Sequence, residues 1–162
     1  DVQDAVSLLV ALEPYQASEV LEDASYPAEH LLGIIEAMDD MNAVKIVSGL
    51  YSGRLFAAFS ARLAVRILPV CSEATAANIL YVMAARNANT TAEVLCQMAD
   101  ETKVARFRLS CLFAQEDVRE VLNNVLASVQ DPSVHERLMR CVEETGEQSL
   151  DKCFFELVQD AM

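Results

Sequence analysis

The chain has 162 residues, a length that suits one domain and is sufficient to bury a hydrophobic core. Its formal net charge at pH 7 is −13, so it lacks the basic stripe that binding to nucleic acids or to anionic membrane surfaces requires. An uncharged apolar stretch from Ala74 to Ala85 is twelve residues long, well below the roughly 20 that span a bilayer. We therefore expect no nucleic-acid partner and no direct membrane insertion.

A short apolar pattern recurs along the chain about every fifteen residues. Small or apolar residues stand at relative positions 0, 3, 4 and 7, which is the spacing of one face of an α-helix. The copies begin at residues 17, 31, 43, 61, 76, 91, 118, 135 and 150, with a weak copy near residue 106. The first copy is Ala17, Val20, Leu21 and Ala24, the sixth is Thr91, Val94, Leu95 and Met98, and the last is Leu150, Cys153, Phe154 and Leu157.

Turn and capping residues separate these copies in chain order. The breaks fall at residues 25–27, 39–40, 52–53, 69, 87–89, 100–102 and 145–147. Pro14 and Pro27 suit first helical positions, and Ser72, Asp131 and Ser149 suit N-caps. Thr90 with Glu93 fits a capping box, and Asp117 with Glu120 resembles one.

A unit of one short helix cannot bury its own apolar face, so it must stack on its neighbours. The sequence therefore predicts an all-α superhelical array of short helices, about 15 residues per repeat, in a single domain covering residues 1–162. Residues 1–102 carry the regular repeats, and residues 103–162 are less regular, with longer helical hairpins that would cap the array. An irregular helical bundle is the alternative that the variable spacing favours.

Three segments carry a family resemblance: Ala17 to Leu21, Ala77 to Met83 and Ala92 to Met98. These short acidic helices, of the type A-x-x-V/I-L-x-x-M, resemble the intracellular N-terminal domain of bacterial-type magnesium transporters and the middle region of the flagellar-motor switch protein. The resemblance covers about residues 14–113. It implies a right-handed helical superhelix used as a regulatory or docking module. The nucleotide-binding-type modules and the membrane part that follow in the transporter are not in this chain, so only the fold is carried over.

The cysteines and histidines show no metal-ligand spacing. The five cysteines at positions 71, 96, 111, 141 and 153 form no CxxC pair, and His30 and His135 stand alone. We expect the cysteines to be small, reduced core residues, which favours a reducing intracellular compartment. One exposed thiol carrying a chromophore or lipid is the alternative. The sequence predicts no cofactor and no metal ligand.

Four acidic pairs lie along the chain: Asp39-Asp40, Asp100-Glu101, Glu116-Asp117 and Glu143-Glu144. A solvated acidic surface is their ordinary role. Three of the pairs lie in turns or at helix starts, where carboxylates cap the helix and complement its dipole, whereas Glu143-Glu144 lies late in its helix. Weak binding of Mg²⁺ or Ca²⁺ is the alternative, since hard cations prefer clustered carboxylate oxygens.

The residues that we expect to bind a partner are Arg54, Arg62, Arg66, Phe154 and Phe155. The three arginines are the only concentrated positive group in the first half and would bind an acidic helix or a carboxylate; the alternative is that they are ordinary solvated surface residues. A second basic group is Lys103, Arg106 and Arg108, while Phe56, Phe59, Leu63 and Leu68 read as core. Phe154 and Phe155 diverge by about 100° around their helix, so one of them points away from the core.

No P-loop, dinucleotide fingerprint, zinc-protease or nucleophile-elbow motif occurs in the sequence. We therefore predict a non-catalytic protein–protein interaction scaffold, linker or subunit of a larger assembly, in which a protein partner covers an apolar face of the array. The alternative is a cation-responsive (Mg²⁺) acidic regulatory domain.

Overall fold

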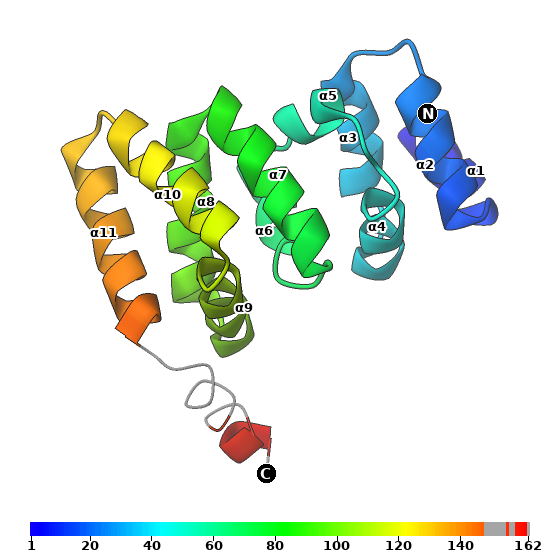
Figure 1. Cartoon of the computed structure of the whole chain (residues 1–162). Coiled ribbons are helices and arrows are strands. Elements are labelled where there is room, and N and C mark those ends of the chain that lie inside the picture. The colour runs from blue at the N-terminus through cyan, green and yellow to red at the C-terminus, as the bar shows by residue number, and fades with distance from the viewer. Residues whose placement is uncertain (148–154, 156–157, 162) are drawn as a thin grey trace.

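The computed structural model describes residues 1–147, 155 and 158–161, and this part of the chain is all-α (Figure 1). The first six helices are α1 (Val2–Ala11), α2 (Pro14–Asp23), α3 (Ala28–Glu36), α4 (Asp40–Val47), α5 (Gly53–Ala57) and α6 (Ala61–Ile67). The next five are α7 (Glu73–Arg86), α8 (Ala88–Glu101), α9 (Lys103–Phe113), α10 (Glu116–Ser128) and α11 (Pro132–Glu147). Since no strand occurs among the described residues, the prediction of an all-α protein is confirmed.

The helices pack in two rows, in which each helix lies beside the helix two places further along the chain. One row contains α1, α3, α5 and α7, and the other contains α2, α4, α6 and α8. Helix α9 interrupts this alternation, because it packs against α8 and α11. The order then resumes, with α10 beside α7 and α11 beside α8, and Figure 1 shows α7 and α10 in front of α6 and α8. The weak copy of the sequence pattern near residue 106 falls on α9.

Helix length changes along the chain. The helices from α1 to α6 have five to ten residues, whereas α7 and α8 have 14 each and α11 has 16. Longer helices therefore begin at α7, ahead of residue 103, where the regularity of the sequence pattern ends.

The apolar pattern predicts the core well. In α8 all four pattern residues, Thr91, Val94, Leu95 and Met98, are buried, as are Ala76, Ile79, Leu80 and Met83 in α7. The expected aromatic stripe is also core, and the rings of Phe56 and Phe59 meet edge to face with centroids 5.8 Å apart. Val20 is an exception, because it is 48% exposed. The last copy of the pattern, at residues 150–157, lies outside the described residues.

Ser18 is buried on α2, the helix that exposes Val20. The Ser18 hydroxyl lies 2.7 Å from the carbonyl oxygen of Ile46 and 2.9 Å from that of Pro14, so burial leaves no polar atom without a partner. Gly49, in the turn that follows α4, lies next to this hydroxyl. A Cβ atom added to Gly49 would lie 2.9 Å from the Cβ of Ser18, so this close approach of α2 and α4 requires glycine.

Several predicted helix starts are confirmed. Pro14 is the first residue of α2, the Ser72 hydroxyl accepts a hydrogen bond from the Thr75 N–H, and the Asp131 carboxylate accepts one from the Ser133 N–H at 2.8 Å. These side chains satisfy N–H groups that have no partner inside the helix. Ser149 lies outside the described residues.

Two predicted capping boxes are wrong. Helix α8 begins at Ala88, because the Asn87 side chain accepts a hydrogen bond from the Thr90 N–H at 3.1 Å and thus caps the helix three residues ahead of Thr90. Helix α10 begins at Glu116 after Gln115, which places Asp117 inside the first turn. Pro27 is also displaced by one position, since it is the N-cap of α3 rather than its first residue.

Candidate partner-binding surface

Arg54, the first of the predicted partner-binding arginines, bonds to its own chain. Its guanidinium donates to the carbonyl oxygen of Tyr26 at 3.0 Å and to that of Ala24 at 3.3 Å. Ala24 is the C-cap of α2, where unpaired carbonyls and the helix dipole concentrate negative charge. Arg54 on α5 therefore holds the turn between α2 and α3.

Arg66 makes the same arrangement one helix further along the chain. Its guanidinium donates to the carbonyl oxygens of Glu36 and Met38, both at 2.9 Å, and forms an ion pair with Asp40 at 2.7 Å. These groups form the turn between α3 and α4. The planar fork of arginine suits such paired acceptors, so Arg66 on α6 holds this turn.

Arg108 on α9 repeats the arrangement a third time, because its guanidinium donates to the carbonyl oxygens of Pro69, at 3.3 Å, and Cys71. In all three cases the two acceptors are two residues apart and lie at the end of a helix or just after it. Arg106 similarly donates to the Ala99 carbonyl oxygen at 3.1 Å. Partner binding by Arg54 and Arg66 stays a prediction, but their donors already have acceptors within the chain.

Arg62 differs from its neighbour Arg66, one turn away on α6. Its side chain is exposed, and no hydrogen bond or ion pair to it occurs within the described residues. Arg62 is thus the member of the predicted basic group whose charge is open to solvent.

Exposed apolar residues mark the first and last described segments. Phe155 is 61% exposed, while Phe154 lies outside the described residues. On α1, Leu9 is buried but Leu8 is 64% exposed and Val2 is 48% exposed. The first helix therefore leaves apolar surface uncovered at its end of the rows.

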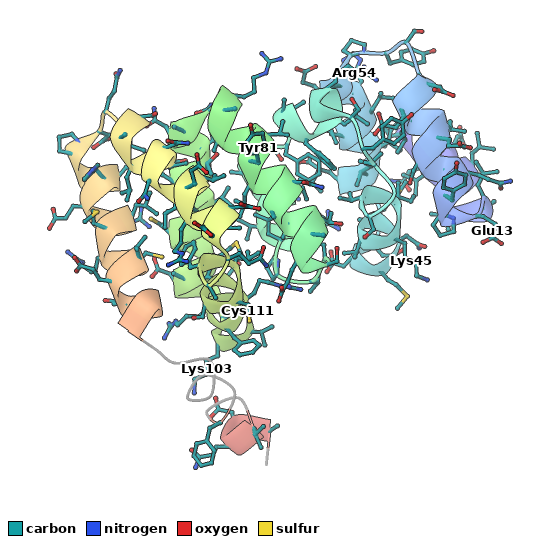
Figure 2. The ribbon with its side chains drawn as sticks, viewed as in Figure 1. Glu13, Lys45, Arg54, Tyr81, Lys103 and Cys111 are labelled. Carbon is teal, nitrogen blue, oxygen red and sulfur yellow. The ribbon has the colours of Figure 1, made fainter. Side chains whose placement is uncertain are left out.

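A groove of about 480 Å³ runs between α7 and α10. Its apolar lining is Ala77, Val118 and Val121, and Tyr81, Asp117 and Glu120 stand around it. Figure 2 shows Tyr81 on α7, and this ring is 67% exposed. Asn78 and Asn124 complete the lining, which contains no basic side chain.

A second hollow of about 570 Å³ lies where Arg54 and Arg86 approach Ala57, Ala58 and Asn87. Its lining carries both signs of charge, because Glu29 also belongs to it. The guanidinium of Arg54 is bonded to the α2–α3 turn, which leaves Arg86 as the more available cation in this hollow.

All four tyrosines are exposed: Tyr15 68%, Tyr26 67%, Tyr51 72% and Tyr81 67%. The Tyr15 hydroxyl donates to the Glu19 carboxylate at 2.7 Å, and this bond raises the pKa of Tyr15. Sequence reasoning missed the tyrosines as a group. The signal was available, because each of them stands outside the 0, 3, 4, 7 positions that form the core.

The negative charge is concentrated in the first third of the chain. Residues 1–53 contain ten acidic side chains and a single basic one, Lys45. The exposed tyrosines Tyr15, Tyr26 and Tyr51 belong to this acidic part, so an approaching partner meets aromatic rings within a negative field.

Three of the thiols in the described part of the chain, Cys71, Cys96 and Cys141, are buried. Burial raises the pKa of Cys71 to about 11 and that of Cys141 to about 12, and it also raises the pKa of Cys96, so these thiols are poor nucleophiles. Asp39 caps α4 through the N–H of Asn42, and the bonds from Asn42 lower its pKa. Within the described residues, no three His, Cys, Asp or Glu side chains lie close enough together to hold a metal ion.

Among the described residues, no helix has the length and apolar content needed to cross a bilayer. No family model, curated protein or solved structure matches this chain. The resemblance to the magnesium-transporter domain therefore stays a prediction.

Proposed function

We propose that this chain is a non-catalytic protein–protein interaction module, a scaffold or subunit of a larger assembly, whose helices form a superhelical array. Support for the array comes from the two rows of helices and from the three arginines that hold the α2–α3, α3–α4 and α6–α7 turns in the same way. Regular ties of this kind keep neighbouring helices in register, and stacked helices present long, continuous binding surfaces.

The observation that carries the interaction function is the exposed, acidic and aromatic groove between α7 and α10. Exposed tyrosines are enriched where proteins bind one another, because the ring supplies apolar area and the hydroxyl supplies a hydrogen bond. The uncovered apolar residues of α1, Val2 and Leu8, add support, since such surface in an assembly subunit is covered by a neighbour.

Affinity purification of the tagged protein from its native source tests this function. A protein that co-purifies in a fixed ratio to the chain, and that stays bound in a second, size-based separation, is the expected result. A chain that elutes alone at its monomer mass, from mild extracts at low and physiological salt, would contradict the interaction function.

A further inference from the structure

We infer that the groove between α7 and α10 docks a short segment of a partner protein, with one or more large apolar side chains flanked by Lys or Arg. This inference rests on the interaction function proposed above and adds to it the place of binding and the chemistry of the bound segment. The juxtaposition that carries it is Tyr81 facing the apolar and acidic face of α10.

The groove is a built feature of two helices that are fixed relative to each other. The Gln115 side-chain amide, at the start of α10, donates to the Glu73 carboxylate at the start of α7, at 2.9 Å. The two helices therefore begin at the same end and run parallel. Val118 is buried against α7, whereas Val121 and Ala77 are half-buried, so apolar surface stays accessible along the floor. The α10 lining spans two turns, from Asp117 to Asn124, which is about 10 Å.

The charge of the lining selects a basic occupant. Asp117 and Glu120 are both exposed beside the apolar floor, and Arg119, the cation nearest to them in sequence, is not part of the lining. On a helical wheel Arg119 lies about 160° from Val121, which places it on the far flank of α10. A Lys or Arg side chain on the occupant would meet carboxylates without a competing cation.

A peptide segment fits this groove better than a small molecule or a second copy of the chain. Small-molecule sites enclose most of their ligand, whereas five of the eight lining residues here, from Asn78 to Asn124, are themselves exposed. A second copy would bring another net charge of −13, which opposes self-association. An apolar anchor on the tyrosine and the valines, with charges on the rim, matches the usual division of an interface into core and rim.

The test pans a phage-displayed library of random 12-residue peptides on the purified chain. The expected result is enrichment of sequences that contain a large apolar residue and at least two Lys or Arg. The most enriched peptide is then synthesised with a fluorophore, and its affinity is measured by fluorescence polarisation on the unmodified chain and on three variants. Tyr81→Ala and Glu120→Lys alter the groove, while Glu116→Lys makes the same charge change on the same helix outside the lining.

Tyr81→Ala should weaken binding about tenfold or more, as expected for an aromatic anchor. Glu120→Lys should weaken it several-fold, and the loss should shrink at high salt, whereas Glu116→Lys should leave the affinity within about twofold. Because all three side chains are exposed, thermal melts should show that every variant folds.

Three results would overturn the groove assignment: enrichment of acidic peptides, no enrichment at all, or a peptide affinity that neither Tyr81→Ala nor Glu120→Lys changes. If the chain forms concentration-dependent dimers and Tyr81→Ala abolishes them, the occupant of the groove is a second copy of the chain, and the peptide assignment is wrong. The interaction function is tested separately. If a co-purifying protein binds the groove variants as well as it binds the parent chain, the interaction function stands and the groove assignment is wrong. If no partner co-purifies, the interaction function and the groove assignment are both wrong.

Discussion

Replacing Arg66 by methionine should destabilise the chain, because the change removes the guanidinium while keeping an apolar stem. The side chain is 25% exposed, and it donates to the carbonyl oxygens of Glu36 and Met38 at 2.9 Å each. Hydrogen bonds to charged groups contribute about 1.5–3 kcal/mol each, but part of this returns when water reaches the freed carbonyls. The ion pair adds little, since Asp40 is 77% exposed. We expect a loss of about 2 kcal/mol in the free energy of unfolding.

The assay is urea denaturation followed by circular dichroism, with thermal melting as a second readout. A loss of this size corresponds to a fall in Tm of roughly 4–8 °C for a domain of this length. Arg62→Met is the matched control, because Arg62 is one turn away on α6 and exposed, and its loss should stay within about 0.5 kcal/mol. Equal effects of the two substitutions would refute the role of Arg66 in holding the α3–α4 turn.

Three further outcomes are expected. Gly49→Ala should lower Tm because its Cβ would press against Ser18, whereas Gly33→Ala, in a helix with open space around it, should raise stability by about 0.5–1 kcal/mol; similar effects of both would refute the close approach. Raising the pH from about 9 to about 11 should lower stability in urea titrations, because the Cys71 and Cys141 thiols ionise first in the unfolded chain, and replacing both by alanine should make this dependence shallower. Millimolar MgCl₂ should raise Tm no more than NaCl at matched ionic strength, because screening of the −13 charge is unselective; a larger rise with Mg²⁺ would favour the cation-responsive alternative.

The sequence predicts the core because helical spacing depends only on local geometry. Leu95 and Met98 are buried as their positions in the pattern require. Val20 departs from the pattern because Ser18 takes the buried side of α2, and its hydroxyl finds the Ile46 carbonyl 28 residues away. No local signal reveals a contact at that separation.

The sequence also does not reveal what the basic residues bind within the chain. A cluster of arginines predicts a positive surface, yet the acceptors of Arg54 and Arg66 are backbone carbonyls 28–30 residues earlier, which carry no sequence signal of their own. The sequence indicated Glu120 only as a capping residue. Its place in the groove with Tyr81 depends on α10 packing against α7, which is three helices earlier in the chain. Where α9 packs is decided by tertiary contacts. The weak copy of the pattern near residue 106 predicts a helix there but not its position against α8 and α11.

The most direct measurement of the central claim is hydrogen–deuterium exchange of the chain, alone and bound to the protein that co-purifies with it. Interaction through the groove predicts slower exchange in α7 and α10 on binding, around Tyr81 and Glu120, with α2 unchanged. A partner that protects α2 or α4 and leaves α7 and α10 unchanged would contradict the groove as its docking site. An exchange pattern identical with and without any co-purified protein would contradict the interaction function itself.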